Sequence, residues 1–210
     1  MRRLLFLVSL VVLIAACSSH PSHTAPPSSA PGAATPTLAS ASATAGASDG
    51  VPSVAPIDTT AWLALAPSGQ GFSVRMPGTA KSSTSTTTAP TGKVPVTSWT
   101  FTDARNRVFE VTMVSFPAGT MAKGPQKTVL DTAVANVASA LGNLTVASQS
   151  DITLDGCPGR SFLMTSPKMN VRGEVLLAGD TVCTIGMGYA PSEADDGSAA
   201  AFLASFKLGV

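Results

Sequence analysis

KTVLDTAVANVASAL, residues 127–141, is the stretch that divides the foldable part of this chain into two runs of strands. Its large apolar side chains, among them Leu130, Val134 and Val137, recur at helical spacing, and Gly142 stands where a helix would stop. Alanine, asparagine and serine fill the positions between them and suit an outer face. The pattern predicts one amphipathic helix in the middle of a folded domain.

Strand patterns lie on both sides of this helix. Each run is rich in β-branched or aromatic residues and is bounded by turn-forming residues. The expected strands are residues 70–76, 94–101 and 108–116 before the helix, and 144–154, 161–165, 171–177 and 182–189 after it. The last two runs are expected to form a hairpin.

The final run has one bulky face and one nearly bare face. Its bulky residues, from Cys183 to Tyr189, alternate with small ones that include Gly186 and Gly188. A bare face lets a helix backbone come close, and strand glycines more often mark such a packing approach than a ligand site. The alternative is a small apolar ligand held there between sheet and helix.

A second helix is expected over residues 192–205. The acidic residues from Glu193 to Asp196 lie near its start, where the helix dipole favours them, and Phe202 and Phe206 point one way. The order of strands, helix, strands and helix predicts an α+β domain, a mostly antiparallel β-sheet with helices packed against it.

Three segments of this domain resemble one group of bacterial exported proteins. They are GFSVRMPG at residues 71–78, LDGCPGR at 154–160 and FLASFKL at 202–208. That group is similar in fold to the PsbP-like α/β/α sandwich, named for an extrinsic subunit of photosystem II. The resemblance implies this fold and a non-catalytic binding or assembly role, although Cys157 departs from the residue expected at the turn.

The first residues, MRRLLFLVSLVVLIAAC at 1–17, have the pattern of an export signal, with a basic start and a short apolar run. The run is well short of the roughly 20 residues that a membrane-spanning helix needs. Ile14-Ala15-Ala16-Cys17 resembles the bacterial lipobox, which implies removal of the signal and lipidation of Cys17 with acyl chains such as palmitate. The alternative is an ordinary secretory signal with a coincidental cysteine.

Residues 18–57 are mostly serine, threonine, alanine, proline and glycine, and Asp49 carries their only formal charge. Such a segment buries too little apolar surface to fold, so a disordered tether of roughly 35 Å is expected. It contains His20 and His23, for which isolated tail histidines are favoured over a metal site. Residues 58–210 then form a single α+β domain, and the protein is expected in the cell envelope, anchored through lipid on the extracytoplasmic side of a membrane.

The residues of the domain exclude several kinds of chemistry. No histidine follows His23, which removes the usual general base, histidine-assisted nucleophiles and imidazole zinc sites. No catalytic residue, cofactor or metal is therefore expected. Seven domain carboxylates are candidates for carboxylate-only catalysis, and no two of them form a recognisable pair: Asp103, Glu110, Asp131, Asp151, Asp155, Glu174 and Asp180.

Those carboxylates have simpler roles. Asp155 and Asp180 are expected to serve turns, and Glu110 and Glu174 to face solvent from strands. The domain has 11 basic and 11 acidic residues, so it lacks the basic surface that nucleic acid demands. Its strand methionines, Met113, Met164 and Met187, are expected to fill the core.

Cys157 and Cys183 remain after the anchor, and an even pair outside the cytoplasm is normally a disulfide. Strand register places them about 9.6 Å apart across two strand spacings, so a bridge requires Cys157 to curl inward. The alternative is two free thiols.

The sequence thus predicts a non-enzymatic lipoprotein whose domain binds a protein or envelope polymer. A carrier of a small apolar ligand is the alternative, and a carboxylate hydrolase is a third possibility.

Overall fold

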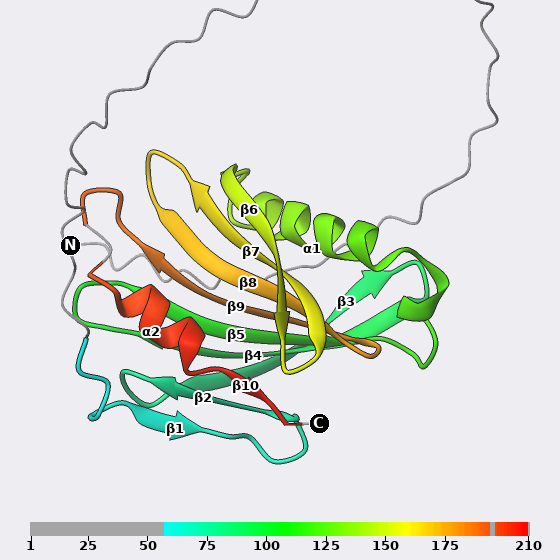
Figure 1. Ribbon diagram of the computed structural model, residues 1–210, viewed down its shortest axis with the longest axis horizontal. Coiled ribbons are helices and arrows are strands. Elements are labelled where there is room, and N and C mark those ends of the chain that lie inside the picture. Colours follow the sequence, from blue (N-terminus) through cyan, green and yellow to red (C-terminus); the bar gives the residue numbers. More distant parts are fainter. Residues whose placement is uncertain (1–56, 194–195, 210) are drawn as a thin grey trace, which may run out of the picture. The chain divides into compact units, whose positions relative to one another are not determined.

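The computed structural model describes residues 57–193 and 196–209, whose strands form one large and one small antiparallel sheet (Figure 1). The strands of the large sheet are β3 (Lys81–Ala89), β4 (Gly92–Thr102), β5 (Val108–Ser115), β6 (Thr145–Leu154), β7 (Cys157–Thr165), β8 (Asn170–Ala178) and β9 (Thr181–Tyr189). Their order is β3-β4-β5-β9-β8-β7-β6, and every neighbouring pair is antiparallel. The small sheet, in the order β1-β2-β10, consists of β1 (Leu63–Leu65), β2 (Phe72–Met76) and β10 (Lys207–Leu208).

One face of the large sheet is covered by α1 (Gln126–Ala140), which lies across β7 and β8 (Figure 1). Leu130, Val134 and Val137 are buried as the helical spacing predicts, against apolar side chains of the strands below that include Phe162 and Met164. The backbone leaves the helix after Leu141, whose N–H donates to the Val137 carbonyl. Burial of this apolar stripe is the main force that holds α1 on the sheet.

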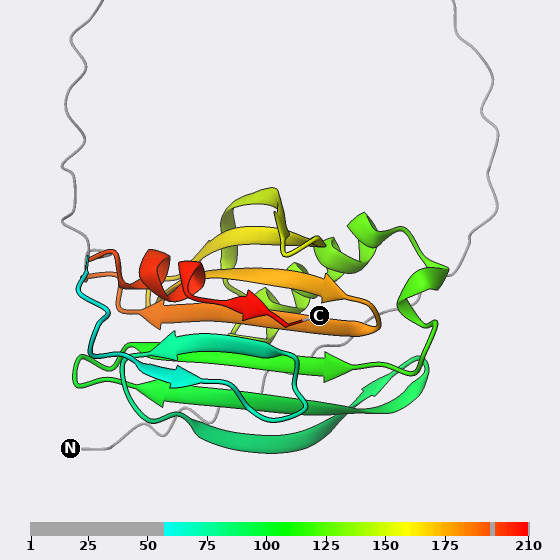
Figure 2. The same cartoon turned by 60° about the horizontal axis from the view of Figure 1, so that its bottom comes forward.

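The opposite face carries α2 (Ser198–Ala204) together with the small sheet (Figure 2). Aromatic rings fill the space between these layers. Phe109 and Phe202 pack edge to face with ring centroids 5.3 Å apart, and Phe72 and Phe206 stack at 5.6 Å. Helices on both faces of a mostly antiparallel sheet confirm the expected α+β class.

The second helix is shorter than the sequence predicted, because α2 begins only at Ser198. Gly197 has a positive φ of 87°, which stops the helix from extending further toward the N-terminus. Asp196 precedes the helix as a bridging carboxylate, since its oxygens accept from the Ser198 N–H at 3.0 Å and from Arg107 at 2.7 Å. Arg107 also pairs with Asp103 at 2.6 Å, so this cluster fixes α2 to the β4–β5 turn.

The strands that the sequence reasoning missed lack an apolar alternation. The sequence of β3 is KSSTSTTTA, in which hydroxyl side chains occupy both faces and seven of the nine residues are exposed. The strands β1 and β10 and a single 3₁₀ turn, η1 (Met121–Lys123), are too short to show a period. β7 begins at Cys157, earlier than the expected residue 161, and pairs with β6 through its whole length.

The expected bridge between Cys157 and Cys183 is wrong, because both thiols are free. The two residues lie on β7 and β9, and β8 runs between these strands. Cys183 is paired in register with Leu176, whose buried side chain fills the space beside Gly159. Two strand spacings of about 9.6 Å exceed the Cα separation that a disulfide tolerates, and no inward curl of Cys157 shortens them.

Neither α1 nor α2, the two α-helices of the described chain, is long and apolar enough to cross a bilayer.

Candidate functional site

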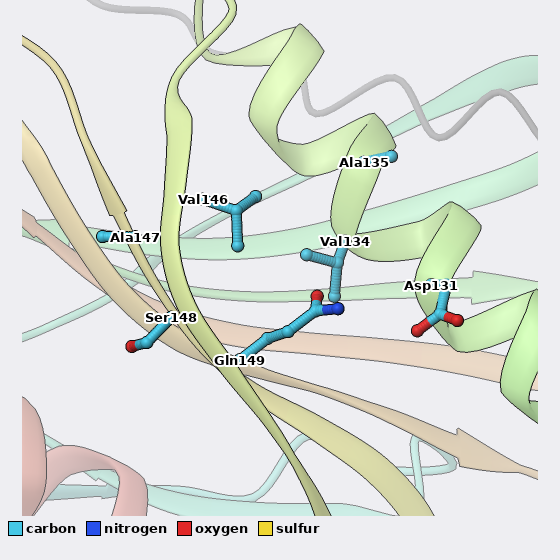
Figure 3. A pocket seen from close by; sticks show the side chains of 7 residues that line it. All are labelled: Asp131, Val134, Ala135, Val146, Ala147, Ser148 and Gln149. Atoms are coloured by element: carbon cyan, nitrogen blue, oxygen red, sulfur yellow. The ribbon is translucent and has the colours of Figure 1, made fainter. Parts of the chain in front are cut away.

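A groove of about 510 Å³ lies between α1 and the edge strand β6 (Figure 3). Val134 of α1 and Val146 of β6 point into it from opposite sides, and Gln149 extends from β6 toward the helix. Val134 is buried at 1% exposure, whereas Val146 is 37% exposed and is one of two large apolar side chains described as exposed. Ala135, Ala147 and Ser148 complete a lining of small side chains.

A buried arginine pairs with Asp131, one of the residues that line the groove. Arg160 of β7 is only 5% exposed and faces α1. Its Nε donates to Asp131 of α1 at 2.9 Å, and its guanidinium also pairs with Asp151 of β6. This one side chain therefore joins the helix, the edge strand and the neighbouring strand, and it holds the two walls of the groove together.

The charges around Arg160 neutralise one another. Lys127 donates to Asp131 at 2.8 Å, one helical turn along α1. The hydrogen bonds from Lys127 and Arg160 lower the pKa of the Asp131 carboxyl below its ordinary value. Two cations and two carboxylates thus form a closed set. The groove offers apolar and neutral polar contacts with no net charge.

β6 is the last strand of its sheet, so its outer backbone groups have no strand partner among the described residues. The β6–β7 hairpin closes with Asp155 and Gly156, both at positive φ, as a type I′ turn requires. Leu154 and Cys157 are then a hydrogen-bonded pair, and bonding alternates along the ladder. Pro158, which has no N–H to donate, falls at the next pair, where no bond to β6 is needed.

This alternation assigns the direction of each N–H in β6. Ser150 and Ile152 bond inward to β7, whereas Gln149, Asp151 and Thr153 present their N–H and C=O groups outward. The register shift between Val146 and Ser148 ends the regular part of the edge. The edge of β6 is therefore regular and open over about five residues, 149–153, and another strand can pair with its three outward-facing residues beside the groove.

The remaining candidate carboxylates hold turns and loops in place. Asp180, in the turn between β8 and β9, accepts the N–H groups of Gly119 and Met121, both at 2.8 Å, and these bonds lower its pKa. Asp155 accepts from the Leu208 N–H at 2.9 Å and so ties the C-terminal strand to the β6–β7 turn. Both residues lie in turns, as predicted, but their carboxylates bond the backbone of distant segments and not that of their own turns.

The expectation that Glu110 and Glu174 face solvent is wrong, because both are partly buried. Burial raises the pKa of Glu110, and a hydrogen bond donated by Thr112 at 2.9 Å opposes that rise. Burial likewise raises the pKa of Glu174, which Arg172 opposes. These two carboxylates belong to strands β5 and β8, and they point to opposite faces of the sheet.

The glycines on the bare face of β9 are partly exposed and lie against Met169 and residues of neighbouring β8. A Cβ built on Gly188 lies 3.0 Å from Cε of Met169, and one built on Gly186 lies 3.3 Å from the Arg172 carbonyl oxygen. At these two glycines a built Cβ thus meets Met169 and the backbone of neighbouring β8, and none of these contacts comes from a helix. The strand methionines Met113, Met164 and Met187 are all buried, as predicted.

Cys17, the expected lipidation site, and residues 18–56 of the expected tether lie outside the described residues. Within the part of the chain that is described, no three His, Cys, Asp or Glu side chains are grouped to hold a metal ion.

Sequence reasoning missed Arg160 and the groove itself. Arg160 lies in a strand, two residues before the buried Phe162, so the two side chains share one face of the sheet. That alternation was the signal available in the sequence. Its partner Asp131 is 29 residues away, so only the folded chain brings them together.

Comparison with known proteins adds a likeness in fold. The chain is similar to the solution structure of cyanobacterial PsbP from Synechocystis, with 13% identity and a TM-score of 0.49, over 70% of this chain and 92% of that one. It is also similar to a crystal structure of a protein of unknown function from Pseudomonas aeruginosa, with 9% identity and a TM-score of 0.35, over 62% and 84% of the two chains. At these values nothing about function follows. No family model and no curated protein matches the sequence.

Proposed function

We propose that this protein is a lipid-anchored, non-enzymatic binding module of the cell envelope, in which the α1–β6 groove receives a partner protein or an envelope polymer. The anchor rests on Ile14-Ala15-Ala16-Cys17 and the export signal before it. Two or more acyl chains on Cys17 give durable attachment, since each buried methylene contributes about 0.8 kcal/mol. Residues 18–57 then let the domain reach roughly 35 Å from the membrane.

The observation that carries the binding role is the groove with a free strand edge beside it. Its walls are fixed by Arg160, which contacts both Asp131 and Asp151, so the groove is formed before any partner arrives. Preformed concave surfaces with apolar floors and a few polar groups are the usual form of binding sites. The carboxylates of the domain hold salt bridges, turns or strand positions, which leaves binding as the use for this surface.

Photo-crosslinking in living cells tests the proposal. A benzoylphenylalanine placed at Ala135, an exposed position lining the groove, is expected to attach to one defined species. The matched control is Thr86, an exposed residue on β3 at the opposite edge of the same sheet. Equal, unselective labelling from both positions would contradict the proposal, as would the absence of any adduct above background.

The anchor has a separate test. Mass spectrometry of the wild type should find a lipid-modified Cys17 at the mature amino terminus, whereas Cys17→Ala should lack the lipid and keep its export signal uncleaved. A wild-type protein that is recovered freely soluble with an unmodified thiol would overturn the lipid anchor while leaving the groove proposal standing.

A further inference from the structure

We propose that the occupant of the α1–β6 groove is an extended, uncharged segment of a partner protein, which pairs with the outer edge of β6 as an additional antiparallel or parallel strand. This inference rests on the proposed function and specifies the partner's chemistry.

The free edge of β6 decides the kind of molecule. Gln149, Asp151 and Thr153 present donors and acceptors at alternating positions, in the spacing that another polypeptide strand matches. A lipid or an apolar small molecule leaves these groups without partners. The ladder that holds β6 to β7 uses the other set of residues, so an added strand costs the fold none of its own bonds.

The groove beside this edge selects the side chains. A strand added beside residues 149–153 alternates its side chains between the two faces of the sheet, and one set lies on the face of Gln149 and Asp151, next to the Gln149 end of the groove. The lining of the groove combines Val134, Val146 and two alanines with Ser148 and Gln149, which suits apolar or small polar residues such as alanine, valine, serine or threonine. Gln149 supplies a neutral polar contact on the same wall (Figure 3).

Charge argues for an uncharged segment. Arg160 and Lys127 are already paired with Asp131 and Asp151, and the rest of β6 carries no charge. The groove therefore presents no unpaired charge that would attract a charged side chain. Residues 149–153 contain neither lysine nor proline, their one charge, Asp151, is paired with Arg160, and the β-bulge of β6 lies before them at residues 146–148.

Area argues against a second folded copy of this chain as the occupant. The five residues of the regular β6 edge, 149–153, span about 17 Å and one strand spacing is about 4.8 Å, which gives an edge on the order of 80 Å². A stable interface between folded partners takes roughly 800 Å² from each. A short flexible segment can use the edge and the groove together, so a segment is the occupant that the dimensions favour.

The test begins with random peptides of about nine residues, the length of a typical strand, displayed on phage and selected against the full-length protein. Selected peptides are expected to be uncharged and rich in small or β-branched residues. Their affinity is measured for the wild type, for Gln149→Pro and for Gln149→Ala. Proline removes the outward N–H of residue 149 without removing a β6–β7 bond, whereas alanine keeps it.

Gln149→Pro is expected to weaken binding by at least about tenfold, and Gln149→Ala by less than about threefold. Circular dichroism checks that the proline variant folds. If the Gln149→Pro variant does not fold, N-methylation of alternate amides in the synthetic peptide is the replacement test. Methylation along one edge of the peptide should abolish binding, and methylation along the other edge should be tolerated.

Full binding to Gln149→Pro, equal effects of both methylation patterns, or no groove-dependent peptide from the selection would each overturn strand addition. The proposed function fails differently. If crosslinking from Ala135 captures a defined glycan, the groove is a binding site and the occupant is wrong, whereas no adduct at all removes the binding role itself.

Discussion

Replacing both carboxylates that face Arg160 is the perturbation whose cost the structure determines best. The Arg160 side chain is 6% exposed, whereas those of Asp131 and Asp151 are 37% and 79% exposed. In Asp131→Asn/Asp151→Asn the guanidinium stays buried without an anion. Breaking a buried pair in this way costs about 3 kcal/mol of the free energy of unfolding, the low end of the usual range because water reaches both carboxylates.

The opposite change is expected to cost much less. In Arg160→Met the two exposed carboxylates return to water and the methionine fills the apolar space, so we expect a loss of about 1 kcal/mol or less. Lys127→Gln is the control for an exposed pair, since the Lys127 side chain is 73% exposed, and it should cost about 0.5 kcal/mol or less. The order of these three losses is the prediction.

Urea unfolding followed by circular dichroism measures all three losses at low ionic strength, where charge is not screened by the denaturant. For a domain of this size the double variant should also melt about 6–12 °C lower than the wild type. A double variant within about 0.5 kcal/mol of the wild type would refute the reasoning. So would an Arg160→Met variant that is the least stable of the three.

Three further predictions concern other parts of the fold. Iodoacetamide should label Cys157 in the native protein and Cys183 only after unfolding, as read by site-resolved mass spectrometry. The reason is that Cys183 is fully buried and that burial raises the pKa of its thiol. A disulfide-linked peptide pair that contains both cysteines would contradict this prediction. Glu110→Gln should raise the free energy of unfolding at neutral pH, since burial raises the folded-state pKa of Glu110 and its ionised form is disfavoured there. That gain should vanish as the pH falls through the folded-state pKa and the carboxyl becomes protonated, so urea titrations showing a gain unchanged at pH of about 3 would count against it. Gly173→Ala should lower the free energy of unfolding by about 1–3 kcal/mol, because its Cβ would lie 2.6 Å from a backbone carbonyl oxygen and 2.7 Å from a phenylalanine ring. Gly124→Ala is the control and should be nearly neutral, since its Cβ would have nothing within 4 Å. Equal melting temperatures for the two variants would contradict this prediction.

The sequence was sufficient to predict the helices and strands in which buried residues recur at a regular spacing. The helix expected at residues 127–141 occurs as Gln126–Ala140, and the strands from residue 144 to residue 189 follow the expected order. The sequence was insufficient for strands whose side chains show no such spacing. β3 is a strand because β4 pairs with it along nine residues, and its own serines and threonines give no sign of a face.

The cysteine pair shows how far register reasoning extends. Counting along the strands gave the correct separation of two strand spacings between Cys157 and Cys183. It did not show whether Cys157 curls inward; in the structure Cys157 stays in the β7 ladder, paired with Leu154. The groove likewise could not be predicted from the sequence, because the contact between Arg160 and Asp131 depends on how α1 crosses the sheet.

Hydrogen exchange at the backbone of β6 tests most directly whether the groove and its edge are the binding surface. In the free full-length protein, the outward amides of Gln149, Asp151 and Thr153 should exchange rapidly, while those of Ser150 and Ile152, bonded to β7, exchange slowly. With the crosslinked or selected partner bound, the three outward amides should slow by at least about tenfold and become as protected as their neighbours. Protection that appears on another surface while these three amides keep their free rates would contradict the account.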